Sequence, residues 1–258
     1  MNAAQFLEAL PHLAFQAVLV MCRVGACGMV LPGLGETEVS STIRLGLALA
    51  VVALLLPGLE SSLPREPETI AATLQLVGTE LAIGFWLGWL ARLMVFALTI
   101  AGQTIGFFIG LASVLTPDPT VGSGGTAVGR FLGMAGTVLV LSTGLYAIPL
   151  RALAESYEVL PAGGPLALGG AAETVAAATA ASFSLALRLA APLLLLSLLL
   201  QMGSGLLARV APQAQVYILA APAQTLAGVA LLAVILPALL AHWAEAARAA
   251  FALLPGLG

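Results

Sequence analysis

Residues 69–116 read TIAATLQLVGTELAIGFWLGWLARLMVFALTIAGQTIGFFIGLASVLT, and this stretch decides the fold class. It contains no proline, and its charged residues are Glu80 and Arg92. Because lipid offers the peptide backbone no hydrogen-bond partners, so long an apolar run is expected to be helical. One straight helix of this length would reach roughly 72 Å, more than twice the hydrocarbon thickness of a bilayer. We therefore predict that the segment bends, folds back or leaves the bilayer. The candidate weak points are its glycines, Gly84, Gly88, Gly102, Gly106 and Gly110.

The composition of the whole chain indicates an integral membrane protein. Of 258 residues, 60% are hydrophobic and 8% are charged, where a soluble domain has about 25% charged residues. So few charges cannot cover a water-exposed surface, and the mean hydropathy is +1.08. The chain has no lysine and a formal net charge of -3. This charge balance excludes a basic face for nucleic acid.

Six apolar segments follow one another, separated by turns rich in proline and glycine. They cover residues 9–31, 39–58, 69–116, 128–150, 174–208 and 213–241. We predict an all-α integral membrane protein with about six long, kinked helices, one of which contains Pro192 as an internal kink. Pro67 and Glu68 suit the first turn of the third helix. Residues 1–11 carry Glu8 and no basic residue, which argues against a cleaved signal peptide.

Several arginines fall inside apolar segments rather than in loops. Arg65, Arg151 and Arg248 can reach water from helix ends, but Arg23, Arg44 and Arg92 are harder to explain in this way. One interpretation is that helices of other chains satisfy the buried arginines, and another is that the protein lies partly outside the lipid. The candidates for buried charge or assembly contacts are Arg44, Glu80, Arg92 and Arg209.

Glu80 is the acidic residue inside the longest apolar segment, and an intramembrane carboxylate is by default a functional candidate. No second acid lies one or two helical turns away, so the relay needed for proton transfer is missing. We favour a buried ion pair of Glu80 with Arg44 or with an arginine of a partner chain. Proton handling is the alternative.

Glycines spaced by four recur along the chain, at Gly84 and Gly88, at Gly102, Gly106 and Gly110, and at Gly129 and Gly133. At helical pitch each set lies on one face, where a neighbouring backbone can approach closely. We predict that they pack helices tightly, and the alternative is a groove that lines a substrate path. If the glycine faces point outwards, they imply assembly with other chains.

A glycine-rich helix end leads into two prolines and then into a Gly/Ser run at residues 122–125. Prolines stop the helix, and irregular backbone at membrane depth survives only where protein or a water-filled cavity surrounds it. The segment is therefore a candidate gate or plug, with an ordinary extramembrane turn as the alternative. The plug candidates are Gly110, Leu111, Val114, Leu115, Pro117, Asp118 and Pro119.

Signatures of catalysis are missing from the sequence. We find no HExxH, GxSxG or GxxxxGK[ST] motif and no Cys/His cluster. His12 and His242 lie far apart without acids or cysteines at metal-ligand spacing, and Cys22 and Cys27 are expected to pack in a helix. We predict no catalytic residue, no metal and no cofactor.

Five short motifs occur in an order that resembles one protein family. They are Arg23 with residues 32–33 (PG) and 41–44 (STIR), residues 80–88 (ELAIGFWLG), 101–106 (AGQTIG) with 118–119 (DP), 153–161 (LAESYEVLP) and 208–213 (ARVAPQ). In this order they resemble the FliR family of flagellar biosynthesis proteins, part of the type III export gate, which has relatives in virulence injectisomes. Leu145 stands where that family has a histidine, and Gln215 where it has an asparagine.

The resemblance implies a single export-gate domain over residues 1–258. It implies a non-enzymatic core subunit that assembles with FliP and FliQ, as helical hairpins around a pore, into a channel lifted largely out of the lipid. Unfolded flagellar subunits would pass through this channel, with FlhB and FlhA as further partners in the export apparatus. The location implied is the bacterial inner membrane at the flagellar basal body. The pore-closing loop of the family falls by position on residues 110–125.

A secondary transporter or small-solute channel is the alternative function. Such a protein is expected to show inverted repeats with paired broken helices around a site at the membrane midplane. We find no convincing internal repeat, and Glu80 alone is little support for ion coupling. A membrane enzyme would need convergent polar groups, which the sequence lacks.

Overall fold

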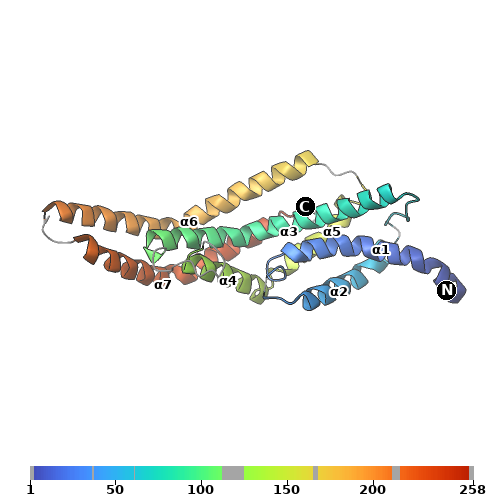
Figure 1. Cartoon of the computed structure of the whole chain (residues 1–258), viewed down its shortest axis with the longest axis horizontal. Coiled ribbons are helices and arrows are strands. Elements are labelled where there is room, and N and C mark those ends of the chain that lie inside the picture. Colours follow the sequence, from blue (N-terminus) through green and yellow to red (C-terminus); the bar gives the residue numbers. More distant parts are fainter. Residues whose placement is uncertain are drawn as a thin grey trace. The chain divides into compact units, whose positions relative to one another are not determined.

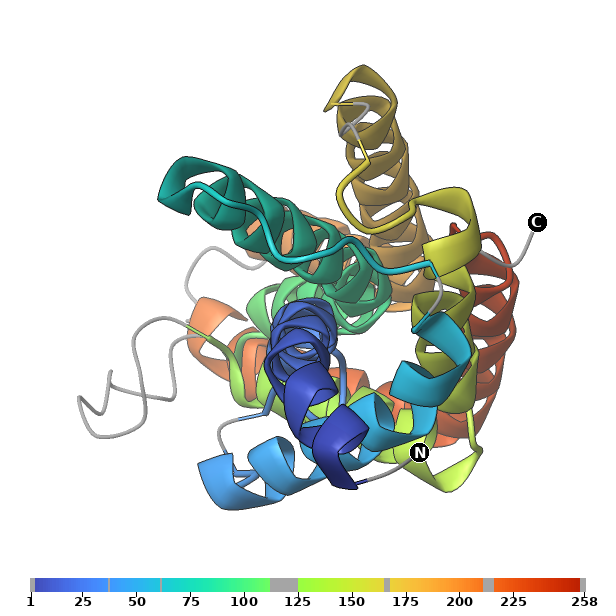
Figure 2. The same ribbon diagram turned by 90° about the vertical axis from the view of Figure 1, so that its right-hand side faces the viewer.

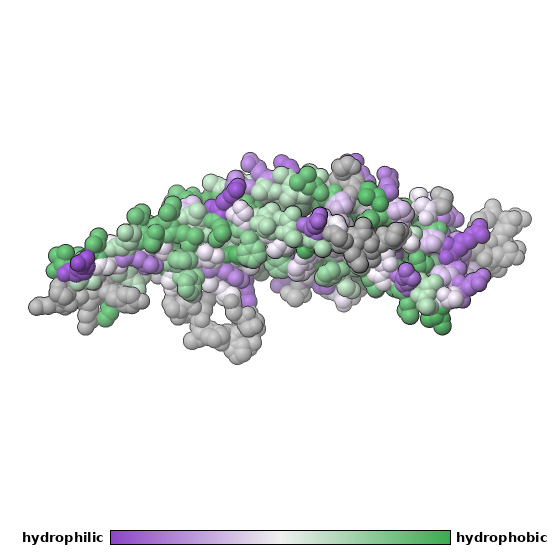
Figure 3. Space-filling model, turned by 90° about the horizontal axis from the view of Figure 1, so that it is seen from above, coloured by the Kyte–Doolittle hydropathy of each residue, from purple (hydrophilic) through white to green (hydrophobic). Residues whose placement is uncertain are grey.

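The computed structural model describes residues 3–36, 38–60, 62–111, 125–164, 168–210 and 216–255, and these residues form helices and turns without a strand (Figure 1). The helices are α1 (Ala3–Val30), α2 (Ser41–Leu59), α3 (Ile70–Phe108), α4 (Ala127–Ser142), α5 (Ala147–Val159), α6 (Leu168–Val210) and α7 (Val216–Phe251). Five helices in the described part of the chain are long and apolar enough to cross a membrane, or six if α4 and α5 form one bent span. This confirms the predicted all-α membrane protein. Hydrophobic side chains cover much of the face shown in Figure 3, and hydrophilic ones gather in small patches.

Helix α3 differs from the prediction, because it runs without a break through four of the five candidate weak points. Its 39 residues span roughly 58 Å at about 1.5 Å per residue. This length exceeds the hydrocarbon thickness, so part of α3 lies beyond it or the helix is strongly tilted. The helix ends at Phe108, and Gly110 then takes a φ of 82°. Only this last glycine marks an end of the helix.

Two other boundaries correct the sequence prediction. The predicted segment 128–150 is two helices, α4 and α5, which meet at a bend of 68°, and Gly144 takes a φ of 75° in the turn between them. Helix α3 begins at Ile70 rather than at Pro67, and Thr69 Oγ1 accepts a hydrogen bond from the Ala72 amide at 3.3 Å. Thr69 thus caps the helix in the way that hydroxyl side chains commonly do.

The chain divides into two compact units. The first contains Met1–Leu93, Val140–Ala177 and Arg248–Gly258. Its core is formed by apolar side chains of α1, α3 and α5, among them Leu19, Ile83, Leu87 and Leu153, which are at most 3% exposed. Helix α2 lies beside α1 (Figure 2), yet Val52 is its one buried side chain in the described structure. Most other side chains of α2 are aliphatic and exposed or half-buried, among them Leu54, which is 80% exposed.

The second unit contains Met94–Leu139 and Ala178–Ala247. It holds the second part of α3 and most of α4, α6 and α7. Helices α6 and α7 follow each other as a hairpin (Figure 1). Trp243 is fully buried and donates a hydrogen bond from Nε1 to the Met94 carbonyl oxygen at 2.8 Å. This bond satisfies the polar edge of a large apolar side chain, as buried indoles require.

Candidate functional site

A buried ion pair joins α1 to α3 in the first unit. Arg23 Nε lies 2.7 Å from Glu80 Oε2, and Arg23 Nη2 lies 3.0 Å from Glu80 Oε1. The side chains are 0% and 1% exposed. This bidentate arrangement gives two parallel charge-assisted hydrogen bonds, which are stronger and more directional than a single contact.

Arg23 also contacts α5 and the residue that follows it. Its Nη1 donates to Ser156 Oγ at 3.1 Å, and its Nη2 donates to the Leu160 carbonyl oxygen at 3.0 Å. The guanidinium carbon lies 3.9 Å from the centre of the Tyr157 ring. Every guanidinium nitrogen therefore has a partner, and one side chain connects three helices of the unit.

Two glycines of α3 bring its backbone close enough for this ion pair to form. Gly84 faces α1 so closely that a methyl group there would clash with the Arg23 carbonyl oxygen, and a methyl group at Gly88 would lie 2.7 Å from the Cys27 carbonyl oxygen. Gly84 and Gly88 are one helical turn apart on α3, and Arg23 and Cys27 are one helical turn apart on α1. Glu80 precedes Gly84 by one turn, so its carboxylate reaches the arginine that α1 presents at the same contact.

The predicted pairing of Glu80 with Arg44 or with a partner chain is wrong, because the partner is Arg23 of the same chain. Arg44 lies on α2 and donates from Nη2 to the carbonyl oxygens of Glu36, at 2.9 Å, and Val39, at 2.8 Å. Both carbonyls belong to the turn between α1 and α2. Arg23 and Arg44 occupy equally apolar stretches, so the sequence offers no means to decide which of them faces α3.

A second ion pair ties the same turn to α3. Arg92 Nη1 lies 2.8 Å from Glu36 Oε1, and Nη2 lies 3.2 Å from Oε2. The two side chains are 21% and 22% exposed. Arg23 and Arg92 are thus ion-paired within the chain, and Arg44 donates two hydrogen bonds within it, although its Nε has no partner among the described residues. This corrects the interpretation that these three arginines depend on helices of other chains.

The glycines of the second unit also face helices of their own chain. A methyl group at Gly102 would lie 2.7 Å from the Val128 carbonyl oxygen, and one at Gly106 would lie 2.5 Å from Thr126 Oγ1. Gly129 faces Gln103 in the same way, and Gly133 faces Thr99. The six predicted packing glycines therefore lie at contacts of α3 with α1 and with α4. They do not point outwards, so they give no support for assembly.

The residues that flank the predicted plug segment on either side are held by hydrogen bonds in the second unit. Gln224 Nε2 of α7 donates to the Phe108 carbonyl oxygen at 2.7 Å, and Ser197 Oγ of α6 donates to the same oxygen. At the other end, Thr126 Oγ1 donates to the Gly102 carbonyl oxygen at 3.2 Å. These contacts fix where the segment leaves α3 and where it enters α4.

The remaining predicted residues lie near the end of α3, at the end of α6 or outside the described residues. Gly110 and Leu111 are described, and Gly110 packs against Thr225 of α7. Arg209 lies in the last turn of α6 with an exposed side chain. The other plug candidates, Val114, Leu115, Pro117, Asp118 and Pro119, lie outside the described residues.

Four residues that these contacts use are not predicted by the sequence pattern. Ser156 and Tyr157 lie in one of the family-like motifs, but nothing in their spacing indicates that they contact Arg23. Ser197 and Gln224 are polar residues inside apolar helices, and that isolation is the one signal that singles them out. Groups of three or more His, Cys, Asp or Glu side chains that could hold a metal ion do not occur among the described residues.

Comparison with known proteins gives consistent matches over most of the chain. The sequence model of the bacterial export proteins, family 1, matches residues 14–250. The flagellar biosynthetic protein FliR of Caulobacter vibrioides is 33% identical over 238 residues, which are 91% of this chain and 95% of that protein. FliR of Escherichia coli is 28% identical over 217 residues, 84% of this chain and 82% of that protein. The Yop proteins translocation protein T of Yersinia pestis is 25% identical over 231 residues, 88% of each chain.

Proposed function

The chain belongs to family 1 of the bacterial export proteins, and from that premise we propose that it is a non-enzymatic core subunit of the flagellar type III protein export gate. The family match and the named relatives make it a component of a type III secretion apparatus. The finer proposal is that it forms the protein-conducting channel together with FliP and FliQ and helps to close it. We place it in the bacterial inner membrane at the flagellar basal body, next to FlhB and FlhA.

The observation that carries this proposal is the match of residues 14–250 together with the coverage of the flagellar relatives. The relative from Caulobacter vibrioides is covered over 95% of its length, so the likeness extends to its whole fold. The flagellar relative from Caulobacter vibrioides is 33% identical over 95% of its length, and the Yop protein is 25% identical over 88% of its length. We take the first match as support for a flagellar client, with unfolded flagellar subunits as the export substrates, although flagellar relatives as a group extend down to 24% identity.

We infer a structural role for the Arg23–Glu80 pair. A carboxylate that carries protons needs access to water or to a second titratable group. Glu80 is 1% exposed, and both of its oxygens accept hydrogen bonds from one arginine. Such a pair fixes the relative positions of α1, α3 and α5, so that the unit can present its outer faces to other subunits.

We propose that residues 110–125 close the channel. The residues that flank the segment support this proposal, because helices α6 and α7 hold the Phe108 carbonyl and α3 holds Thr126. A segment that closes a pore must start and finish at fixed points, or it would not return to the same place after each opening.

The test of the subunit role is co-expression. We expect this chain to yield one discrete complex when it is produced with FliP and FliQ, and to restore motility to a cell that lacks its own FliR. A chain that stays a stable, monodisperse monomer in the presence of both partners would overturn the proposal. Size-exclusion chromatography with native mass spectrometry and a swimming assay are the measurements.

A further inference from the structure

Helix α6 packs one face into the second unit and leaves the opposite face uncovered. The packed face consists of side chains that are at most 5% exposed, namely Ser182, Ala186, Leu189, Leu193 and Ser197. On the other side of the helix, exposed residues recur at helical spacing, namely Ala180, Ser184, Arg188, Leu195 and Leu199. An arginine therefore lies in the middle of a largely apolar outer face.

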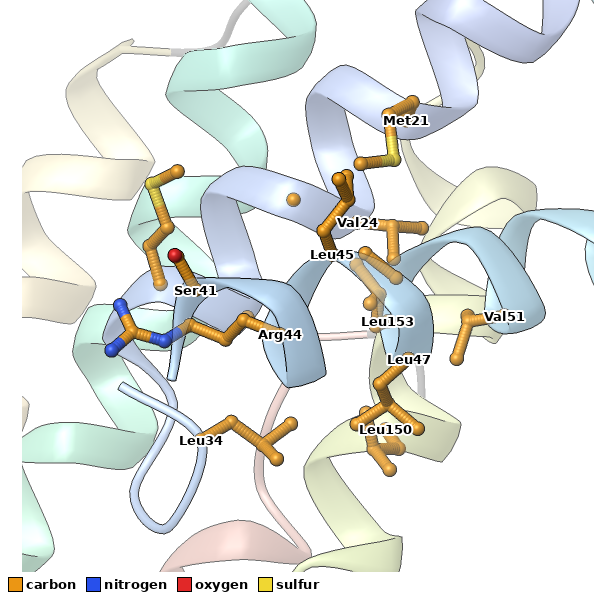
Figure 4. A pocket seen from close by; sticks show the side chains of 14 residues that line it. Met21, Val24, Leu34, Ser41, Arg44, Leu45, Leu47, Val51, Leu150 and Leu153 are labelled. Atoms are coloured by element: carbon orange, nitrogen blue, oxygen red, sulfur yellow. The ribbon is translucent and has the colours of Figure 1, made fainter. Parts of the chain in front are cut away.

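Arg188 makes no hydrogen bond or ion pair in the described part of the chain. Other arginines of the helices are held differently. Arg23 and Arg92 are ion-paired, and Arg44, which lines an apolar pocket of the first unit (Figure 4), donates to two carbonyl oxygens. Arg209 lies in the last turn of α6. Arg188 lies roughly 30 Å from either end of this 43-residue helix, too far for its side chain to reach the helix ends.

The residues around Arg188 fit neither water nor lipid chains as their surroundings. Phe183 and Leu187 precede it and are 52% and 57% exposed, and Leu195 follows it by two turns and is 61% exposed. Contact with water would leave these apolar side chains unburied. Contact with lipid chains would leave the guanidinium without a counter-charge, and arginines inside apolar spans normally pair. A surface that offers apolar contact and one negative charge satisfies the whole face.

Small residues next to Arg188 leave room for a helix. Ala180 and Ser184 lie two turns and one turn before it on the exposed face. Small side chains let a neighbouring helix backbone come close, which brings the short side chain of an aspartate or glutamate within reach of the guanidinium. The partner is thus best matched by a helix that carries one acid among apolar residues.

A second copy of this chain does not offer such a helix in its described residues. Glu80 is buried and paired with Arg23. The other glutamates of the described helices lie close to helix ends, as Glu173 does in α6 and Glu245 in α7. The acid that meets Arg188 must therefore come from a different protein.

We propose that the outer face of α6 around Arg188 binds a helix of another export-gate subunit, and that an aspartate or glutamate in the apolar part of this helix pairs with Arg188. The inference rests on the proposed function, because it requires assembly with other subunits. Phe183, Leu187 and Leu195 shield the pair from water, so salt screens it little. A bidentate arginine–carboxylate contact also fixes the register of the partner helix, which apolar contacts alone specify weakly.

Arg188→Met in the chain co-expressed with FliP and FliQ tests the proposal. The lone chain should fold as before, because Arg188 has no partner within its described part. Assembly should weaken by at least about tenfold, since the acid of the partner is left buried and unpaired. Size-exclusion chromatography with native mass spectrometry measures the yield of complex. Arg248→Met, in the exposed last turn of α7, is the matched control and should assemble normally.

The two ways in which this experiment can fail are distinguishable. Normal assembly of Arg188→Met would overturn the inference and leave the subunit role in place. If the unmodified chain itself forms no complex with FliP and FliQ, the proposed function is wrong as well.

A crosslink identifies the acid. The chain has no lysine, so Arg188→Lys introduces a single one, and dicyclohexylcarbodiimide joins an amine directly to a carboxylate that it contacts. We expect peptide mass spectrometry to find a link from position 188 to an aspartate or glutamate of FliP or FliQ. Arg151→Lys is the positive control, because position 151 faces Glu155 of the same chain. A link between two copies of this chain would overturn the proposal. The absence of any link between subunits while the control reacts, as expected if a lipid phosphate neutralises Arg188, would overturn it too.

Discussion

Arg23 is a charged residue that is fully buried in an apolar unit, so its charge must be stabilised there. Removing an ion pair from water carries a desolvation cost that the mutual attraction offsets only when the geometry is good and the other donors are satisfied. Both conditions hold here, because the pair is bidentate and Ser156, Leu160 and the Tyr157 ring take up the rest of the guanidinium. Loss of either Arg23 or Glu80 alone is therefore expected to reduce the stability of the protein more than loss of both residues.

Glu80→Gln tests this sensitivity. The substitution leaves the Arg23 guanidinium buried without a counter-charge, and we expect a loss of about 3–5 kcal/mol in the free energy of unfolding. A double variant, Arg23→Met with Glu80→Met, should recover most of this loss. Thermal unfolding can be followed with a thiol-reactive dye, because the Cys27 thiol is buried one helical turn from Arg23.

The exposed pair of Arg151 and Glu155 supplies the control. Its arginine side chain is 73% exposed, so Arg151→Gln should leave the unfolding temperature unchanged. Export offers a second measurement that bears on the role of Glu80. If Glu80→Gln folds and assembles normally but abolishes export, the carboxylate has a chemical role and the structural assignment is wrong.

At the scale of helices, close packing depends on positions where any side chain would collide. Gly84→Ala and Gly88→Ala each place a methyl group against a carbonyl oxygen of α1. We expect both to separate α1 from α3, weaken the ion pair and lower the yield of folded protein, because overpacking commonly costs about 1–3 kcal/mol. Gly78→Ala is the matched control on α3, since nothing lies within 4 Å of the added methyl group. It should be neutral or stabilising by up to about 1 kcal/mol.

The end of α3 is stabilised in a different way, because side chains of α6 and α7 donate hydrogen bonds to the Phe108 carbonyl oxygen. Gln224→Met keeps the length of the side chain but removes the hydrogen bond to the Phe108 carbonyl oxygen. We expect faster amide exchange at residues 107–111, because the last turn of α3 loses one of its two side-chain donors. Hydrogen exchange with mass spectrometry measures the change. Gln201→Met on the exposed face of α6 should leave these amides unaffected, and equal exchange in both variants would refute the anchoring role.

How far the sequence predicts these elements depends on what each pattern encodes. Apolar runs and the turns between them predict the membrane-spanning helices well, because both follow from composition alone. The break near Gly144 was missed because both sides of it are equally apolar. Gly84 and Gly88 were predicted both as weak points and as packing positions. The backbone of α1 lies against them, and the helix stays unbroken there.

The partners of the buried polar side chains could not be predicted from the sequence. Arg23 and Arg44 both interrupt apolar helices, and only the packing of α1 on α3 decides which of them meets Glu80. Ser156 contributes to that site from a helix more than a hundred residues away in sequence, with a separation of 133 from Arg23. The spacing of residues along one helix cannot predict a contact between distant helices. The resemblance to a family, in contrast, predicts the fold of the whole chain.

For the molecule as a whole, the internal pairing of its arginines changes what an assembly surface must look like. Arg23, Arg44 and Arg92 are used within the first unit, while large aliphatic side chains such as Leu54, Val210 and Val234 are at least 77% exposed. We therefore expect apolar contacts to hold the proposed complex with FliP and FliQ together. Salt screens exposed charges but does not weaken such contacts. The complex should keep its mass in native mass spectrometry after purification in high salt, and dissociation would show that charged contacts dominate.

Shortening residues 111–125 tests the proposed closure of the assembled gate. The deletion removes the predicted plug and leaves Phe108 held by α6 and α7 and Thr126 held by α3, so the complex should still assemble at its normal level. We expect higher ion conductance across a planar bilayer that contains the shortened complex, since a pore without its closing segment no longer excludes water and ions. Assembly must be verified on the same preparation, because a dissociated gate would also leak. Unchanged conductance from an intact shortened complex would remove the plug assignment and leave the subunit role in place.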